Sequence, residues 1–405
     1  MLCPLVSIHI NQIVYLPCVH ARREAETNTS KPIIGLPKMH LEPGERRVFL
    51  PGFIAALQEM GFKVLLEKDY GASIDLAEED YTARADQVQF TGLETIYQQE
   101  YVLVLRYPGD EKVRWLKPGA CLISMLHYPT RPQRVELLRS KKLHAISLDT
   151  IMNDSKRRMV ENLPSVAWNG LRISMGELSK VYPPPGFEDP GRPAIRVTLI
   201  GAGEVGKNVI QAAVAYGNPG LRGELLAAGI PGVMVQVVDY DLTGHTGIMR
   251  EIFSRTDILV DATQRPDPSR PVIPNDWIAW LPPHAIITDL SVDPYLLESN
   301  PPVVRGIEGI PQGSLDKYIF QPGDPDWDLT VPPSIASTQR RTVVSCYSWP
   351  GIFPEDCMQH YGDQLTPLMK RLVKKSYAGL SPEGDFFERG LHRGTLKYWL
   401  ASHTA

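Results

Sequence analysis

The first half of the chain shows short apolar runs separated by segments with helical spacing. Apolar runs of about four to eight residues, bounded by proline, glycine or charged residues, are typical of buried strands. Segment 52–61 has instead the apolar spacing of a helix and ends at Gly61, a common helix stop. Segment 131–142 has the pattern of an amphipathic helix. The predicted strands are KPIIGLP (31–37), FKVLLEK (62–68), YVLVLRYP (101–108), GACLISMLHYP (119–129) and LHAISLD (143–149).

The second half repeats this alternation after an interruption. Segment 181–194, VYPPPGFEDPGRPA, is rich in proline and glycine and cannot lie inside a helix or strand. Strands alternating with helices predict parallel sheets, so we expect an α/β fold with two domains. Residues 386–401 are a further helix candidate. The predicted parts are an extension at 1–30, a first domain at 31–180 completed by 345–405, and a second domain at 181–344.

Three glycines follow the first strand of the second domain. In IRVTLIGAGEVGKNVIQAA (195–213) they have the GxGxxG spacing, with an apolar strand before them and a proline-free helix after them. That context is required of a dinucleotide-binding turn, in which the glycines allow a tight turn, close approach of a pyrophosphate, and close helix packing. The helix N-terminus attracts phosphates. An ordinary glycine-rich turn is the alternative. The predicted cofactor-binding residues are Gly201, Ala202, Gly203, Glu204, Val205 and Gly206.

The next strand, VMVQVVDYD (233–241), reaches an acidic residue at Asp239. A carboxylate at the end of this strand typically binds the ribose hydroxyls and repels a 2′-phosphate, which favours NAD over NADP. Such an acid usually lies about 20 residues after the glycines, and segment 218–232 delays it here. Because that segment is rich in proline and glycine, we interpret it as a surface insertion. Asp241 is the alternative acid.

Composition narrows the class of protein. Hydrophobic residues make up 43% and charged residues 22% of the chain, which is ordinary for a soluble globular protein. The formal net charge of −4 does not favour a nucleic acid or an acidic membrane as partner. The five cysteines form no CxxC pair, so neither a metal site nor a disulfide framework is predicted, and a reducing cytoplasm is the simplest location. No apolar run reaches the length of about 18 residues that a membrane span needs.

Polar residues stand at the ends of two predicted strands of the first domain. Arg106 ends one strand and His127 ends the next, while Arg47 precedes the first helix. If the strands are parallel, Arg106 and His127 emerge at the edge where open α/β sheets bind ligands. Guanidinium groups hold carboxylates with paired hydrogen bonds, and histidine, with an ordinary pKa of about 6.5, exchanges protons at neutral pH. Each residue alone could be structural, but together with a dinucleotide site they predict a substrate site.

These motifs resemble the alanine dehydrogenase and pyridine-nucleotide transhydrogenase family, which includes saccharopine dehydrogenase and carboxyethyl-ornithine synthase. The resemblance covers roughly residues 31–405. It implies two Rossmann-like domains, for substrate and for NAD, and a homo-oligomer, either a dimer or a hexamer. The motifs that carry it are IIGLPKMHLEPGERRVFLPGF, LRYP, LHYP, GAGEVG, AIITDLSVDP and CYSWPGIFP. The roles it implies are substrate binding by Arg47 and Arg106, catalysis by His127 and Asp293, and contact with the nicotinamide side of the cofactor by Ser348 and Trp349.

The chain also departs from the family's pattern. The replacements are Arg106 for a lysine, Pro294 and Tyr295 for a glycine pair, and Ser348 and Trp349 for asparagine and methionine. A guanidinium can hold a carboxylate but does not act as a base in proteins. These changes keep the arrangement of a dehydrogenase and leave the substrate open.

Three functions follow as hypotheses. The leading one is an NAD-dependent oxidoreductase of a 2-amino acid or its 2-oxo acid, with His127 exchanging protons while the nicotinamide exchanges hydride. The second is an opine-type reductase that joins a 2-oxo acid to the amine of an amino acid. The third is a nucleotide-binding module without turnover.

Overall fold

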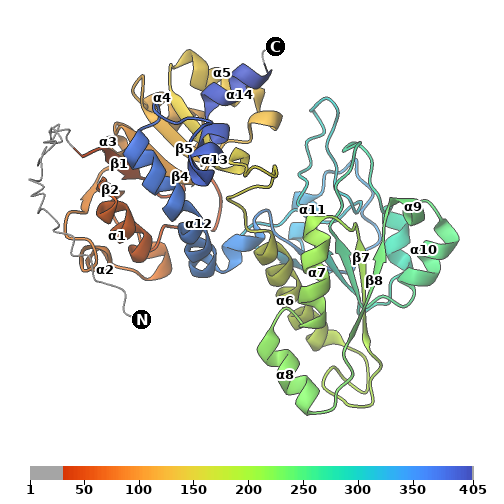
Figure 1. Ribbon diagram of the computed structural model, residues 1–405. Helices are drawn as coiled ribbons and strands as arrows, with labels where there is room; N and C mark the ends of the chain where they lie inside the picture. Colours follow the sequence, from red (N-terminus) through yellow and green to blue (C-terminus); the bar gives the residue numbers. More distant parts are fainter. Residues whose placement is uncertain (1–30, 404–405) are drawn as a thin grey trace, which may run out of the picture. The chain divides into compact units, whose positions relative to one another are not determined.

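The computed structural model describes residues 31–403, so the extension predicted for residues 1–30 lies outside the described residues (Figure 1). Two six-stranded sheets organise this part of the chain. No helix within residues 31–403 is long and apolar enough to cross a membrane.

The first sheet is entirely parallel, with strand order β3-β2-β1-β4-β5-β6. One core lies between this sheet and helices α1, α2, α12 and α13, and another lies between the opposite face and α3, α4, α5 and α14. Its strands are β1 (Ile33–Leu36), β2 (Lys63–Glu67), β3 (Gln89–Thr91), β4 (Tyr101–Arg106), β5 (Cys121–Met125) and β6 (His144–Ser147). Its helices are α1 (Pro51–Glu59), α2 (Glu78–Thr82), α3 (Leu93–Tyr97), α4 (Asp110–Trp115), α5 (Pro132–Ser140), α12 (Pro354–Lys375), α13 (Phe386–Gly394) and α14 (Leu396–His403).

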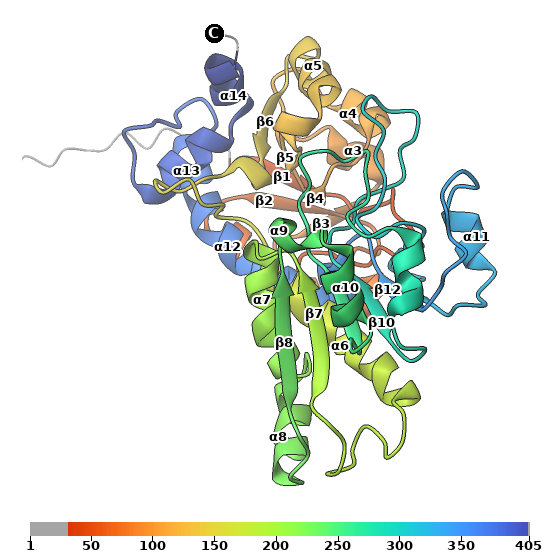
Figure 2. The ribbon, with the colours of Figure 1, turned by 90° about the vertical axis from the view of Figure 1, so that its right-hand side faces the viewer.

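The second sheet has the order β11-β12-β10-β9-β7-β8, and β11 alone is antiparallel to its neighbour. Helices α7 and α10 pack on opposite faces, as seen beside β7 and β8 in Figure 2. The strands are β7 (Ile195–Ile200), β8 (Val233–Val238), β9 (Ile258–Asp261), β10 (Ile286–Asp289), β11 (Ile319–Phe320) and β12 (Thr342–Ser345). The helices are α6 (Leu163–Val181), α7 (Glu204–Val214), α8 (Pro219–Ala227), α9 (Tyr240–Thr243), α10 (Thr246–Phe253) and α11 (Asp326–Thr330).

The predicted α/β fold with two largely parallel sheets is therefore confirmed, and the C-terminal helices α12, α13 and α14 pack on the first sheet. Helix α6 departs from the predicted domain boundaries, which placed residues 31–180 in the first domain. Its buried residues Ala167, Leu171, Met175 and Leu178 belong to the core of the second sheet, where they pack with α7. The packing therefore changes near residue 162 and not at 181, because the apolar stripe of α6 faces the second sheet.

The predicted surface insertion at 218–232 contains a helix. Asn218 caps α8 by accepting hydrogen bonds from the backbone N–H groups of Gly220 and Leu221, and Pro219 occupies its first position. Leu225 is buried, whereas Leu226 is 72% exposed. The insertion is thus an ordered surface helix anchored by Leu225 and by Ile230, which follows the helix and is also buried.

Candidate functional site

Both sheets reverse their strand order where the predicted site residues lie. In the first sheet β1 lies between β2 and β4, and in the second β7 lies between β8 and β9. Open α/β sheets bind ligands outside the carboxyl ends of the strands at such a switch point. Arg47 lies in the connection after β1, and Arg106 ends β4. The glycine turn follows β7 and so lies at the switch point of the second sheet, while His127 and Asp293 follow β5 and β10, one strand further along each sheet.

The glycine turn has the geometry that a dinucleotide requires. Gly201 has φ +96°, and a Cβ there would lie 2.8 Å from the carbonyl oxygen of Ala262. A Cβ on Gly206 would lie 2.3 Å from the carbonyl oxygen of Gly201, which reflects close packing of α7 on the turn. A Cβ on Gly203 would have nothing within 4 Å, so the space beside the N-terminus of α7 is open. The turn therefore fits a phosphate-bearing ligand.

Two cavities adjoin this turn. The loop cavity, of about 410 Å³, is lined by Gly203, Glu204, Val205, Thr263, Arg265 and Asp293 among others. The Asp239 cavity, of about 130 Å³, is lined by Gly201, Asp239, Tyr240, Thr263 and Arg265 among others. Asp239 is exposed at the end of β8 and caps α9 by accepting a hydrogen bond from Tyr240 N at 2.8 Å. Asp241 lies within α9 and does not line this cavity, so the geometry favours Asp239.

The Arg106 cavity, of about 580 Å³, lies at the end of β4. Its lining includes Glu42, Arg106, Ser314, Thr330 and Tyr347. Arg106 Nη2 lies 3.3 Å from Glu42 Oε1, and both side chains are about one third exposed. The guanidinium also lies 4.9 Å from the ring centre of Tyr347, whose buried hydroxyl has no hydrogen-bond partner in the described chain. The pair of Arg106 and Glu42 is therefore open to a ligand that carries charge.

Arg47 is placed differently from its predicted role. Its side chain is 3% exposed, and both Nε and Nη2 donate to the carboxylate of Glu45, with Nε at 2.8 Å. Burial raises the pKa of Glu45, but the hydrogen bonds from Arg47 outweigh it and hold that pKa below its ordinary value. Arg47 does not line the Arg106 cavity. The guanidinium of Arg47 is already paired with Glu45, so the contact is structural. Arg47 is therefore not free to bind the carboxylate of a substrate.

His127 is held at the end of β5 by a buried acid. Its backbone has φ +52° and ψ +50°, in the left-handed region. Asp149 Oδ2 lies 3.2 Å from Nδ1 of His127, and Asp149 Oδ1 accepts from the backbone N of His127 at 3.1 Å. Ser147 Oγ donates to the same Oδ1 at 2.8 Å. The imidazole is 47% exposed, so Asp149 fixes its Nδ1 side and leaves Nε2 toward solvent.

The electrostatic surroundings of Asp149 favour its ionised form. Burial raises the pKa of Asp149, but hydrogen bonds from His127 and Ser147 outweigh it and lower that pKa to about 2. Asp149 is therefore ionised throughout the neutral range and accepts a hydrogen from Nδ1. A histidine held in this tautomer has Nε2 free to accept and return a proton.

Asp293 lies in the loop after β10 and is paired with an arginine. Arg265 Nη2 donates to Asp293 Oδ2, and the Asp293 side chain is 35% exposed toward the loop cavity. Beneath this pair, Asp261 and Asp289 are aligned on β9 and β10 and are buried. Asp293 therefore lines the same cavity as the glycine turn, and His127 does not line that cavity.

The buried acids Asp261 and Asp289 share one hydroxyl. Ser291 Oγ lies 3.2 Å from Asp261 Oδ2 and 2.9 Å from Asp289 Oδ1, and Arg305 pairs with Asp289. One hydroxyl hydrogen cannot serve two carboxylates, and the set is satisfied when Asp261 carries a proton. Burial raises the pKa of Asp261, which agrees with that assignment.

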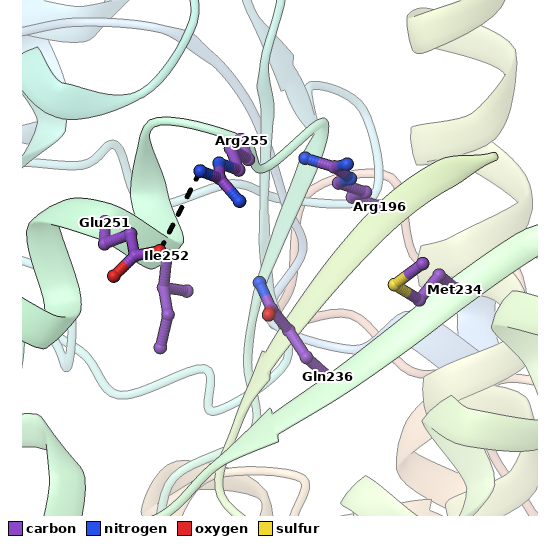
Figure 3. A pocket seen from close by; sticks show the side chains of 6 residues that line it. All are labelled: Arg196, Met234, Gln236, Glu251, Ile252 and Arg255. Atoms are coloured by element: carbon purple, nitrogen blue, oxygen red, sulfur yellow. Dashed lines mark ion pairs between the residues drawn. The ribbon is translucent and has the colours of Figure 1, made fainter. Parts of the chain in front are cut away.

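A further cavity, of about 200 Å³, lies away from these residues. It is lined by Arg196, Met234, Gln236, Glu251, Ile252 and Arg255 (Figure 3). Arg255 Nη2 forms an ion pair with Glu251 Oε1 at 3.8 Å. Arg196 and Met234 lie near the start of β7 and β8, opposite the ends from which the glycine turn and Asp239 emerge. Both members of the ion pair are more than half exposed, so this cavity is a solvated surface groove outside the candidate site.

Residues 35–168 match the family model described as alanine dehydrogenase/PNT, N-terminal domain. This segment belongs to that family. The chain is 22% identical over 361 residues to the NAD(P) transhydrogenase subunit alpha of Haemophilus influenzae, covering 85% of the chain but only 66% of that protein. It is 25% identical over 275 residues to the alanine dehydrogenase of Bacillus subtilis, covering 64% of the chain and 71% of that protein.

Solved structures agree with the alanine dehydrogenase/PNT assignment at the level of fold. An L-alanine dehydrogenase has a TM-score of 0.66 at 18% identity and covers 90% of this chain and 94% of its own. A transhydrogenase from Sinorhizobium meliloti has a TM-score of 0.57 at 15% identity and covers 84% and 94%. At these identities the similarity establishes a shared fold. The activity has to be argued from the residues of the site.

Trp349 and Ser348 were both assigned to the cofactor from the alanine dehydrogenase/PNT pattern. The assignment of Trp349 needs revision, and that of Ser348 remains a prediction. Trp349 was predicted to contact the cofactor, but it is 1% exposed and packs in the core of the second sheet. Its Nε1 donates to the carbonyl oxygen of Asp289 at 2.8 Å, because a buried indole N–H needs an acceptor. Ser348 precedes it, is half-buried, and donates its backbone N–H to Cys346 Sγ at 3.4 Å. Its contact with a cofactor remains a prediction.

Several residues of the site, Glu42 beside Arg106 among them, were missed in the sequence. Asp149 follows strand β6 as His127 follows β5, and the paired strands bring them together, so its position after LHAIS was a usable signal. Glu45 precedes Arg47 by two residues, but no local pattern shows that it occupies that guanidinium. Arg265 lies in a proline-rich connection after β9 without any motif, and only the fold brings it to Asp293.

Proposed function

We propose that this protein is an NAD(H)-dependent oxidoreductase that interconverts a 2-amino acid and its 2-oxo acid. The arrangement of His127 with Asp149 carries the proposal, because a surface histidine oriented by a buried carboxylate is built to exchange protons. Arg106, which ends the neighbouring strand β4, supplies a charge for a carboxylate at the same edge of the sheet. The glycine turn and Asp239 supply a dinucleotide site at the second sheet.

The residues present fit a dinucleotide. When bound, NAD accepts the hydride in oxidation and NADH supplies it in reduction. The open space beside Gly203 and the N-terminus of α7 would hold the pyrophosphate, and Asp239 would accept hydrogen bonds from a ribose. A carboxylate at that position disfavours a 2′-phosphate, which supports NAD as the cofactor of this proposal.

The proton steps fall to His127. In oxidation the substrate reacts as the free amine, and loss of hydride from its α-carbon leaves an iminium ion. Water adds to that carbon while Nε2 of His127 removes a proton from the water, which gives a neutral carbinolamine. Nε2 then returns that proton to the nitrogen of the substrate, and as ammonia leaves, Nε2 takes the proton of the hydroxyl group, which gives the 2-oxo acid. Asp149 stabilises the imidazolium that forms between these two transfers. Arg106 holds the substrate carboxylate but takes no proton, since guanidinium stays charged.

An opine-type reductase is the second candidate, and Glu42 is the observation that favours it. Its carboxylate stands beside Arg106 in an open cavity of about 580 Å³, so the same wall offers one group for a carboxylate and one for an ammonium. An amino acid used as the amine donor carries both charges. Such a substrate would exchange the contact between Arg106 and Glu42 for two charge-assisted bonds of its own.

Oxidation of NADH tests the proposal directly. Purified protein is given NADH and a panel of 2-oxo acids, each with ammonia or with one of several amino acids, and absorbance at the NADH band is followed. Turnover with ammonia supports the amino-acid dehydrogenase, and turnover only with an amino acid supports the opine-type reaction. NADH binding without oxidation under any combination would contradict both and leave a nucleotide-binding module.

A further inference from the structure

Arg265 occupies the wall between the two cavities beside the glycine turn. It lines the loop cavity together with Gly203 and Glu204, and it lines the Asp239 cavity as well. Its side chain is 5% exposed. A ligand that runs from the Asp239 cavity past the N-terminus of α7 would therefore pass a buried guanidinium.

The hydrogen bonds of Arg265 are incomplete. Nη2 donates to Asp293 Oδ2 and, at 2.5 Å, to the carbonyl oxygen of Val304, while Nη1 donates to the carbonyl oxygen of Arg270 at 2.8 Å. Nε is buried and has no partner in the described part of the chain. A buried donor without a partner is unfavourable, so this guanidinium has an unused capacity to bind an acceptor.

The charge of Arg265 depends on one exposed partner. Asp293 is its ion-pair partner and is 35% exposed, so solvent or a ligand can reach it. Other charged groups also act on Arg265, because Arg305 repels it and the acids Asp261 and Asp267 attract it, but Asp293 alone forms an ion pair with it among the described residues. Asp293 therefore balances a positive charge that a phosphate in the loop cavity could balance instead.

We propose that Arg265 is shared between Asp293 and the phosphates of the dinucleotide. Nucleotide binding would draw the guanidinium onto the pyrophosphate and free the carboxylate of Asp293 to contact substrate or a ribose. Asp293 thus holds Arg265 while the site is empty and competes with the phosphates of an incoming dinucleotide for it. Arg265 is a cofactor-binding residue in this scheme, and the inference rests on the proposed nucleotide site but not on turnover.

Competition predicts a gain of affinity, which loss of structure cannot produce. We expect Asp293→Asn to bind ADP-ribose about three- to tenfold more tightly than the wild type, because the competitor for Arg265 is weakened. Arg265→Gln should bind ADP-ribose about ten- to a hundredfold more weakly, since a charge-assisted contact is lost. In the double variant, Asp293→Asn should no longer increase the affinity for ADP-ribose, because Arg265, for which Asp293 and the phosphates compete, is absent.

The measurement is isothermal titration calorimetry with ADP-ribose and with adenosine, which lacks phosphate. Adenosine affinity should be unchanged in all variants. Asp267→Asn is the matched control, because Asp267 lies in the loop of Arg265 and attracts it, but forms its ion pair with Arg270. Arg265→Lys keeps the charge and should recover part of the affinity for ADP-ribose.

Three results would overturn the proposal: no tightening in Asp293→Asn, the same tightening in the double variant or in Asp267→Asn, or an equal loss of adenosine binding in Arg265→Gln. If Arg265→Gln does not fold, Asp293→Asn against Asp267→Asn still decides, since both keep Arg265. A protein that shows the expected pattern yet oxidises no NADH with any substrate would refute the proposed reaction while leaving this inference intact.

Discussion

Replacing Asp149 with asparagine should remove the ability of His127 Nε2 to accept a proton while leaving the imidazole in place. Asp149 Oδ1 accepts from His127 N and from Ser147 Oγ, so the amide oxygen of an asparagine would keep that position. Its NH₂ group would then stand at the position of Oδ2 and donate to Nδ1 of the imidazole. That contact puts the hydrogen of the neutral imidazole on Nε2. Because a protonated Nε2 cannot accept a proton, the base is lost.

The pKa of Asp149 gives the magnitude by which its surroundings stabilise the ionised carboxylate. The pKa of Asp149 falls from its ordinary 3.8 to about 2, a difference that corresponds to roughly 2 kcal/mol of stabilisation of the carboxylate. The side chain is 6% exposed, so solvent screens this interaction little. The folded-state pKa is depressed, so the stabilisation is complete above pH 3.8 and is lost as pH falls through about 2. All of it is present at neutral pH.

We expect Asp149→Asn to lower the rate of hydride transfer at least about a hundredfold, since a general acid–base group contributes about 10²–10⁴-fold and the wrong tautomer removes it. The assay is single-turnover oxidation of NADH with a saturating 2-oxo acid and amine, with NADH affinity measured in parallel. His127→Asn should fall to a similar rate, and the double variant should be no slower than either, because the two residues act as one unit.

Ser147→Ala is the matched control for Asp149→Asn. Ser147 donates to Asp149 and not to the imidazole ring, so its loss should cost much less than loss of the acid. A rate for Asp149→Asn within about threefold of the wild type would refute the tautomer argument. Equal losses in Asp149→Asn and Ser147→Ala would point to a general disturbance of the strand ends.

Four other changes give separate tests. Arg106→Met should raise KM for the oxo acid about ten- to a hundredfold with little change in NADH affinity, and an unchanged KM would remove Arg106 from the substrate site. Asp239→Ser should weaken NADH binding and improve NADPH binding, measured by fluorescence titration, and a wild type that prefers NADPH would contradict it. Gly206→Ala should abolish nucleotide binding or folding, measured by calorimetry and circular dichroism, because its methyl group would lie 2.3 Å from a backbone oxygen. Arg47→Met should destabilise the fold by about 3–5 kcal/mol in denaturant titrations, because it leaves the buried Glu45 carboxylate without its ion-pair partner and with only the backbone N–H of residue 47 as a donor, and normal stability with a raised KM would return Arg47 to substrate binding.

The fold was predictable because its signals are local. Apolar runs such as 101–106 and the glycine spacing at 201–206 depend on neighbours in sequence, and each produced the expected strand or turn. Helix α6 shows the limit of this kind of evidence. Its periodic apolar stripe indicates that it packs on a sheet, but two sheets were available, and only the tertiary contacts select the second.

The site was less predictable because its decisive contacts join distant segments. The position of His127 after a strand was visible, whereas its partner Asp149 required the pairing of β5 with β6. Arg47 matched a pattern in sequence, but the burial of its guanidinium against Glu45 depends on how the loop folds. Charge and spacing identify groups that can bind a ligand, and they do not show which of those groups another side chain already occupies.

The left-handed backbone at His127 also limits how this position can vary. With φ at +52°, most side chains are strained there, while glycine, asparagine, aspartate and histidine are tolerated best. Of these four, histidine alone has an ordinary pKa close to neutrality. Substitutions that the fold accepts most easily would therefore keep the β5 end and the neighbouring strands intact while removing the proposed proton carrier. On the proposed function, a lineage that loses histidine here would keep a folded protein with its glycine turn and lose the proposed reaction, so a non-catalytic descendant lies one backbone-compatible substitution away.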